Sequence, residues 1–340
     1  MFETSIRRLG SKENGFFYRY PGTGETVREE RVLSRIADLK VPPAWEEARI
    51  ARSPPRAKVQ AVGYDSAGRV QYLYSAKYRE QREREKFERV LRFADALPEM
   101  RKTTSDHLGH KKLVAEKVLA TMTRLMNTAH FRVGDERYAR KNKTYGIATI
   151  RRKHLSIDGD TMTFEYSGKW GKTHRKVVTD RRLRGVVEEC AALPGYEVFK
   201  YLDDDGGVRD VKARDLNLYV KRVMGEEFTP KDFRTWAGTL IAAVKLAELG
   251  PATEPKHADK NVLQAVDAVA ERLGNTRDIA RASYISPRVI DHYLEGSVVA
   301  YHAEHLEEVI AAEQGDLTDG ERALLDLLKR ELRRDLRKAA

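Results

Sequence analysis

The chain has 340 residues, of which 34% are charged and 41% hydrophobic, a balance typical of a water-soluble globular protein. Lysine and arginine outnumber the acidic residues 63 to 52, which gives a formal net charge of +11. That excess favours a polyanionic partner, nucleic acid before an anionic membrane, although charge alone also fits a merely basic soluble protein. The single cysteine, Cys190, excludes a disulfide framework and a cysteine zinc site.

The sequence contains no run of eighteen apolar residues and no signal-peptide pattern at residues 1–10. We therefore expect a cytoplasmic protein with no membrane partner.

The length suits roughly two domains, and residues 1–77 mix short apolar stretches with turn signals. This pattern predicts a small β-rich domain with strands at 15–20, 59–64 and 69–74. In the last strand, alternation separates Gln71 from Tyr72 and Tyr74, which share one face. Tyrosines on an exposed face beside an arginine suit contacts with sugars, bases and phosphates, but tyrosines that close a small β core fit the same spacing.

The composition changes at Tyr78 to that of a charged helix. The spacing of its apolar residues extends this helix to Leu97, and Pro98 should end it. We place a domain boundary in the charged run at residues 80–85. The expected domains are residues 1–85, rich in β structure, and residues 86–340, mostly helical.

The second domain should open with a helix over residues 111–128 and continue as a small three-stranded sheet. The predicted strands are 144–150, 161–166 and 175–179. Glycines on both sides of Lys169 and Trp170 indicate a hairpin turn, which puts Lys169 at its tip. A lysine on a turn is usually only solvated.

After Asp180 the pattern is helical to the end of the chain. Thr229 and Pro230 are typical of a helix start and place Arg234 within the first two turns, where free amide groups favour an anion. A helix over residues 261–273 should close on Gly274. Further helices are expected from Ser286-Pro287 to Gly296 and from Asp319 onward.

Nine histidines are present, and only His302 and His305 have a spacing that could share a metal ion. Because no third ligand stands nearby, we expect no metal site.

Four stretches carry the clearest functional pattern: FRVGDERY at 131–138, SGKWGK at 167–172, KDFRTW at 231–236 and LGNTRDIARASYISP at 273–287. Each alone means little, but as a set they resemble the type IB DNA topoisomerases of the small poxvirus and bacterial branch. The resemblance runs from about residue 68 to residue 291. It implies an α+β fold, with a β-rich N-terminal DNA-clamp domain and a mostly α-helical catalytic domain that contains a small three-stranded sheet.

The resemblance also implies roles for particular residues. It implies that Tyr284 is the nucleophile and Lys169 the general acid. It also implies that Arg132 and Arg234 stabilise the transition state. Asn275 stands nine residues before the tyrosine, where most relatives carry histidine. The stretch at 68–74 looks like the family's DNA-contacting strand, so Gln71, Tyr72 and Tyr74 are expected DNA-binding residues. Tyr138, which matches the family pattern in FRVGDERY, is also expected to bind DNA.

This chemistry needs these residue types. Arginine forks match the non-bridging oxygens of a phosphodiester and stay charged when buried, and a lysine can protonate a departing sugar oxygen. An asparagine amide can donate to a phosphate oxygen but cannot take up a proton. The phosphotyrosine ester keeps the energy of the broken bond, so resealing needs no ATP, metal or cofactor.

The sequence therefore predicts an ATP-independent enzyme that relaxes supercoiled double-stranded DNA through a 3′-phosphotyrosine intermediate. We expect a nucleoid-associated monomer that closes around the duplex as a clamp. A tyrosine recombinase shares the chemistry, but recombinases usually carry histidine three residues before the second arginine, where this chain has Lys231. The alternative of another class is a basic architectural DNA-binding protein without catalysis.

Overall fold

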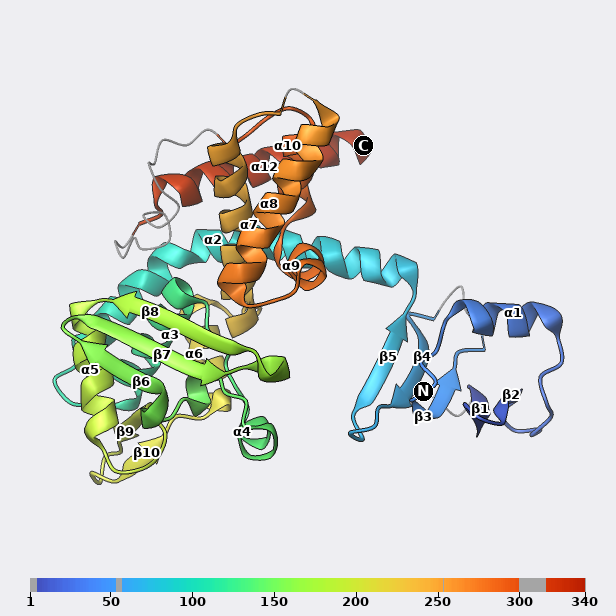
Figure 1. Cartoon of the computed structure of the whole chain (residues 1–340), viewed down its shortest axis with the longest axis horizontal. Helices are drawn as coiled ribbons and strands as arrows, with labels where there is room; N and C mark the ends of the chain where they lie inside the picture. Colours follow the sequence, from blue (N-terminus) through green and yellow to red (C-terminus); the bar gives the residue numbers. More distant parts are fainter. Residues whose placement is uncertain (1–4, 53–56, 253, 300–315, 340) are drawn as a thin grey trace. The chain divides into compact units, whose positions relative to one another are not determined.

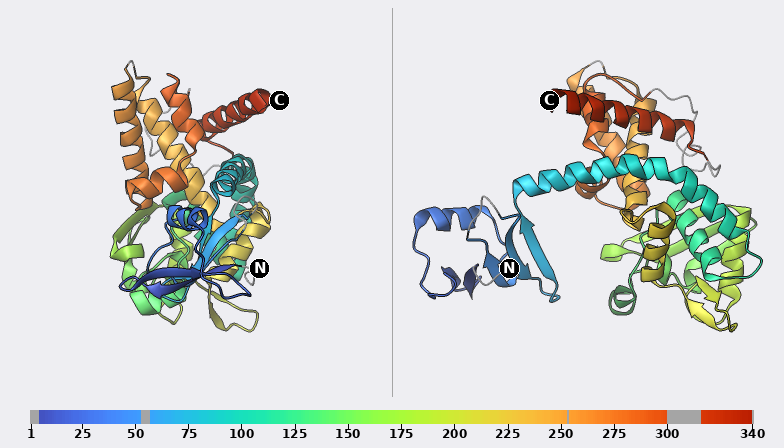
Figure 2. Two further views of the ribbon diagram at one scale, coloured as in Figure 1. Left: turned by 90° about the vertical axis from the view of Figure 1, so that its right-hand side faces the viewer. Right: turned by 180° about the vertical axis from the view of Figure 1, so that it is seen from behind.

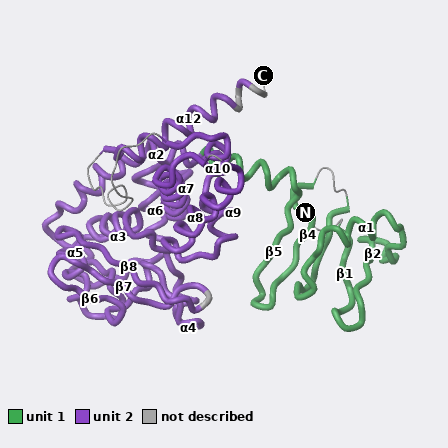
Figure 3. Tube along the Cα trace, turned by 45° about the horizontal axis from the view of Figure 1, so that its top comes forward, with its two compact units in different colours: residues 1–88 green, residues 89–340 purple. Residues whose placement is uncertain are grey.

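The structure is a computed structural model that describes residues 5–52, 57–252, 254–299 and 316–339 (Figure 1). The chain divides into two compact units, Met1–Glu88 and Arg89–Ala340 (Figure 3). The expected α+β fold is confirmed, with antiparallel sheets and separate groups of helices. None of the described helices is both long enough and apolar enough to cross a membrane.

The first unit is built on a five-stranded antiparallel sheet in the order β2-β1-β3-β4-β5. The strand predicted at 59–64 is present with those bounds, and its partner begins one residue later than predicted. The five strands are β1 (Ile6–Ser11), β2 (Gly15–Arg19), β3 (Glu46–Ile50), β4 (Val59–Tyr64) and β5 (Val70–Tyr74).

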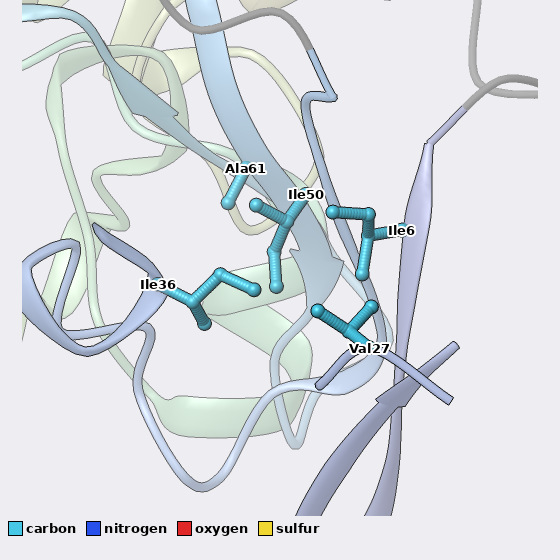
Figure 4. Close-up of a cluster of buried hydrophobic side chains, with 5 residues drawn as sticks. All are labelled: Ile6, Val27, Ile36, Ile50 and Ala61. Atoms are coloured by element: carbon cyan, nitrogen blue, oxygen red, sulfur yellow. The ribbon is translucent and has the colours of Figure 1, made fainter. Parts of the chain in front are cut away.

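A cluster of buried aliphatic side chains forms the core of this unit, namely Ile6, Val27, Ile36, Ile50 and Ala61 (Figure 4). Ile36 belongs to helix α1 (Glu30–Asp38), which the sequence analysis missed. Nine residues give only about two and a half turns, too few for a clear helical period. Leu73 of β5 packs against the cluster, so the alternate residues Tyr72 and Tyr74 face away from it.

Helix α2 (Ala76–Leu108) corrects the prediction that Pro98 ends a helix at Leu97, because Pro98 lies inside it. A proline within a helix costs about 3 kcal/mol. Phe93, Leu97 and Met100 are fully buried around this point, and their burial offsets that cost.

The second unit begins with the remainder of α2 and then α3 (Ala115–Ala129), which starts four residues later than predicted. The three-stranded antiparallel sheet is confirmed, in the order β6-β7-β8, but its first strand is β6 (Leu155–Asp158) and not residues 144–150. Residues 144–150 instead contain the 3₁₀ turn Ile147–Thr149. The other two strands are β7 (Thr161–Ser167) and β8 (Thr173–Thr179), and helix α4 (Glu136–Asn142) precedes them.

The chain beyond Asp180 is mostly helical, as predicted, but two short strands interrupt it. These strands, β9 (Lys200–Leu202) and β10 (Val208–Asp210), form a hairpin that is too short to produce a clear alternation. The helices of this part are α5 (Arg181–Ala192), α6 (Ala213–Met224), α7 (Pro230–Leu249), α8 (Pro255–Leu273), α9 (Arg277–Tyr284), α10 (Pro287–Leu294) and α12 (Asp319–Ala339).

Helix α7 is the central element of the helical layer, where it packs against α8, α9, α10 and α12 (Figures 1 and 2). Thr229 begins it as predicted, and Asp232 accepts hydrogen bonds from the Thr229 N–H and hydroxyl, each at 2.8 Å. A buried ion pair between Arg101 of α2 and Glu321 of α12, 2.7 Å apart, attaches the C-terminal helix to the same unit. The start and packing of α7 thus fix the place of Arg234, five residues after Thr229.

Candidate active site

Arg132 lies in the loop that follows α3, and its guanidinium points toward the end of α8. One terminal nitrogen, Nη2, donates to the carbonyl of Gly274 at 3.1 Å and to the Oδ1 of Asn275. The other, Nη1, is 3.0 Å from Nε2 of His174. Burial and then the charge of Arg234 lower the pKa of Arg132 from its ordinary value.

The loop that carries Arg132 is held by close backbone contacts. The N–H of Ile147 donates to the Arg132 carbonyl at 2.8 Å. Gly134 has φ +89°, and a Cβ there would lie 2.9 Å from the backbone nitrogen of Gly146. Both features require glycine at position 134, which is the physical reason for the glycine in FRVGDERY.

Arg234 is buried in the second turn of α7, with a relative exposure of 3%. Its Nη1 donates to the carbonyl of His130 at 2.6 Å, and its Nη2 donates to the carbonyl of Leu273 at 2.9 Å. The same Nη2 is 3.5 Å from Oδ1 of Asn275. The two arginines therefore converge on one amide oxygen.

Asn275 follows the left-handed Gly274 that ends α8 as predicted. Its backbone N–H donates to the carbonyl of Ala270 at 2.8 Å, which is the hydrogen bond of a Schellman cap. The side-chain oxygen accepts from both arginines, whereas the side-chain nitrogen Nδ2 has no hydrogen-bond partner among the described residues. The amide thus keeps an unused NH2 group beside the two guanidinium groups.

Tyr284 is the last residue of α9 and lies against Arg234, whose Cζ is 5.1 Å from the centre of the tyrosine ring. Burial raises the pKa of the phenol, but the charge of Arg234 and its hydrogen bond to the phenol lower it. Lys231 and Arg132 add to this lowering, and the net pKa lies below the ordinary value of 10.0. The site therefore favours the phenolate, the nucleophilic form of tyrosine.

The backbone of Tyr284 is anchored on α7. The hydroxyl of Thr239 donates to the Tyr284 carbonyl at 3.2 Å and accepts from the N–H of Ser286 at 3.2 Å. A Cβ on Gly238 would lie 2.6 Å from the Tyr284 carbonyl oxygen, so α7 and the end of α9 approach more closely than an alanine would allow.

The two guanidinium groups make hydrogen bonds only with neutral acceptors, and neither Arg132 nor Arg234 pairs with a carboxylate among the described residues. An uncompensated buried charge is costly, so the arrangement favours an anion that completes it. Lys176 of β8 lies in the same positive electrostatic potential. Burial, followed by the charges of Arg234, Arg272 and Arg132, lowers its pKa to about 7.

Lys169 occupies the place predicted for it, in the 3₁₀ turn Lys169–Gly171 between β7 and β8. Its side chain is exposed at the hairpin tip, whereas Arg234 is buried and Arg132 is half-buried. The structure thus brings Arg132, Arg234, Asn275 and Tyr284 into direct contact and places Lys169 on the neighbouring hairpin.

The sequence analysis missed three residues of this site: His174, Lys176 and Gly238. His174 and Lys176 lie on β8, where alternation alone marks them only as members of one strand face. Gly238 reads as an ordinary small residue within a helix. None of the three belongs to a spacing pattern that indicates chemistry.

The expected DNA-binding residues are placed as follows. Tyr72 and Tyr74 are 44% and 40% exposed, and their ring centres are 5.9 Å apart on one face of β5. Gln71 lies on the other face, where its amide donates to Asp65 at 2.8 Å. Tyr138 is 40% exposed on α4.

The described residues contain no group of three or more His, Cys, Asp or Glu side chains that could hold a metal ion. His302 and His305, the pair considered for a shared metal, lie outside the described residues.

Known families match this chain along most of its length. The model for the catalytic core of eukaryotic DNA topoisomerase I matches residues 75–300. The model for the N-terminal domain of bacterial DNA topoisomerase IB matches residues 15–65.

Curated viral proteins agree with these matches. A DNA topoisomerase 1B of Acanthamoeba polyphaga mimivirus is 32% identical over 85% of this chain and 87% of the relative. The DNA topoisomerase 1B of Vaccinia virus (strain Copenhagen) is 22% identical over 78% of this chain and 81% of the relative.

The family model of the topoisomerase I catalytic core covers residues 75–300, the α-rich part of the chain that carries the site described above. The chain belongs to the type IB DNA topoisomerases, in their poxvirus and bacterial branch. It is thus an enzyme that acts on DNA, and the matches support neither the recombinase nor the non-catalytic alternative.

Proposed function

We propose that this topoisomerase relaxes supercoiled duplex DNA by cutting and resealing one strand at Tyr284. The observation that carries the proposal is the arginine pair of buried Arg234 and half-buried Arg132, whose hydrogen-bond partners are neutral and which lie beside a phenol of lowered pKa. A DNA phosphodiester supplies the negative charge that such a site lacks.

In the cleavage step the Tyr284 oxygen attacks phosphorus and loses its proton to solvent. The bond from phosphorus to the 5′ oxygen breaks, and Lys169 gives its proton to that oxygen. Arg132 and Arg234 stabilise the charge on the non-bridging oxygens, and the unused Nδ2 of Asn275 donates a further hydrogen bond to one of them.

The product is a 3′-phosphotyrosine and a free 5′ hydroxyl. One phosphodiester replaces another, so the reverse attack by the 5′ oxygen restores the strand without ATP or a metal ion. Between the two steps the free end rotates and releases supercoils.

We further propose that residues 1–85 act as a DNA-clamp domain and residues 86–340 as the catalytic domain of a monomer. The exposed tyrosine face of β5 and the exposed Tyr138 support DNA contacts from both parts. Stacking and polar contacts with sugar and phosphate suit such tyrosines.

Relaxation of a supercoiled plasmid in EDTA without ATP tests the proposal. The wild type should produce a ladder of topoisomers, and Tyr284→Phe should bind DNA and relax nothing. Tyr196→Phe is the matched control, since Tyr196 is 79% exposed, and it should relax at the wild-type rate. Relaxation by Tyr284→Phe, or a requirement of the wild type for ATP or a metal, would contradict the proposal.

A further inference from the structure

His174 lies at a junction between the parts of the active site. It is buried on β8, five residues after Lys169, with a relative exposure of 6%. Its Nε2 is 3.0 Å from Nη1 of Arg132. Because a guanidinium has only donors, Nε2 must be the acceptor and the imidazole must be neutral, with its proton on Nδ1.

The surroundings keep the imidazole neutral. Burial, and then the charges of Arg132, Lys176, Arg234 and Lys172, lower the pKa of His174 to about 4. The acceptor on Nε2 is therefore available to Arg132 at neutral pH.

Two glycines enclose the imidazole ring. A Cβ on Gly168 would lie 2.2 Å from Cδ2 of His174, and a Cβ on Gly274 would lie 2.1 Å from its Cε1. Gly168 immediately precedes Lys169, and Gly274 immediately precedes Asn275. The ring is thus packed between the backbones next to two residues of the site while it accepts a hydrogen bond from a third.

We propose that His174 is a positioning residue that sets the Lys169 hairpin in place against Arg132 and the Gly274–Asn275 turn. The assignment rests on the proposed function, in which Lys169 protonates the leaving oxygen. Backbone hydrogen bonds within residues 168–172 close the turn itself, and the buried His174 packs against Gly168, the residue next to Lys169. A histidine that served only as core filling would need no acceptor directed at the arginine.

The test compares His174→Phe with the wild type in single-turnover cleavage of saturating DNA. Phenylalanine fills the ring volume but offers no acceptor to Arg132. We expect cleavage to slow by about 100-fold, the effect of roughly 1 Å of misplacement, while the non-covalent Kd changes less than twofold. His174→Gln retains an acceptor and should recover most of the rate. His257→Phe, at an exposed site in α8, is the control and should cleave normally.

A second substrate identifies the route. A 5′-bridging phosphorothiolate leaves as a thiolate, which needs little protonation. The defect of His174→Phe should shrink at least tenfold on it, as that of Lys169→Ala should. An equal defect on both substrates, a normal rate on ordinary DNA, or a loss explained by weaker binding would overturn the proposal.

Gly168→Ala carries the same test if His174→Phe does not fold. Its added methyl group displaces the imidazole without removing it, and the same selective rescue is expected, whereas an equal defect on both substrates would overturn the assignment. Adduct formation by the wild type and its loss in Tyr284→Phe, measured alongside, show whether the proposed function holds independently of His174.

Discussion

Arg132 and Arg234 owe their shared orientation to neutral acceptors, the carbonyls at the ends of α3 and α8 and the amide oxygen of Asn275. Carbonyl and amide oxygens hold a guanidinium in place without neutralising it. The positive field at Tyr284 is therefore preserved until a phosphate enters, and its effects are visible in the lowered pKa of Lys176 and of Tyr284 itself.

Asn275→Ala removes both the oxygen that joins the arginines and the unused Nδ2 donor. Loss of one preorganised donor typically costs about 10²–10³ in rate. Cleavage should fall by about that factor with little change in non-covalent Kd, as measured by single-turnover assays. Asn275→His should remain active, because an imidazole N–H reaches a similar acceptor. A normal rate in Asn275→Ala would remove position 275 from the catalytic set.

Lys176 gives a prediction for stability against pH. The unfolded chain holds the proton on this lysine up to about pH 10, whereas burial and the neighbouring cations lower its folded pKa to about 7. Between these values the unfolded state binds more protons, so the free energy of unfolding rises with pH. Lys176→Met lacks this contribution. The free energy of unfolding of the variant, relative to that of the wild type, should therefore fall from pH 7 to pH 10, as measured by chemical denaturation. A constant difference across that range would contradict the lowered pKa of Lys176.

At the scale of the elements, the position of Tyr284 depends on how closely α9 approaches α7. Gly238 permits this close approach. The Thr239 hydroxyl of α7 then donates to the Tyr284 carbonyl and accepts from the Ser286 N–H. A glycine within a helix costs about 1 kcal/mol relative to alanine, a cost that α7 bears at the point of contact.

Gly238→Ala should therefore destabilise the protein, although alanine favours helices, and should slow cleavage by roughly 100-fold through displacement of Tyr284. Gly185→Ala in α5 is the control, because a Cβ there meets no atom within 4 Å. It should leave cleavage unchanged and raise stability by about 1 kcal/mol. Thermal melting and adduct formation measure both variants, and a stabilised, fully active Gly238→Ala would show that the close approach is not required.

The sequence predicted correctly those helix ends that are determined by a few adjacent residues. Thr229 and Pro230 mark the start of α7, and Gly274 marks the end of α8, because caps depend on a few adjacent positions. Pro98 misled for the opposite reason, since the burial of Phe93 and Leu97 outweighs a local penalty.

The active site divides in the same way. The motif residues were found by resemblance, and the structure brings Arg132, Arg234, Asn275 and Tyr284 together. His174 has no such signal, because its importance comes from contacts with Arg132, Gly168 and Gly274, and two of these lie far from it in sequence. Contacts of this kind cannot be read from spacing.

At the scale of the whole molecule, the net charge of +11 and the exposed tyrosines of β5 describe a protein suited to duplex DNA. Phosphate contacts release counterions, so affinity must fall as salt rises. In our proposal the tyrosine face of β5 adds contacts with DNA that do not depend on charge.

Tyr72→Ala combined with Tyr74→Ala should weaken non-covalent DNA binding at every salt concentration by about tenfold, which is about 1.4 kcal/mol. The slope of log Kd against log salt should stay unchanged, and so should the cleavage rate of bound DNA. Titration of a labelled duplex between about 50 and about 200 mM salt measures the Kd and its dependence on salt. Tyr196→Ala serves as an exposed-tyrosine control, and wild-type affinity in the double variant would exclude these tyrosines from the DNA interface.

The most direct test is to locate the covalent bond. A duplex whose short fragment with the free 5′ hydroxyl diffuses away after cleavage should trap the wild type in EDTA without ATP as a protein–DNA adduct. After digestion, mass spectrometry should find the 3′ phosphate on Tyr284, and Tyr284→Phe should give no adduct. A phosphate attached to any other residue, or undiminished adduct in Tyr284→Phe, would contradict the account.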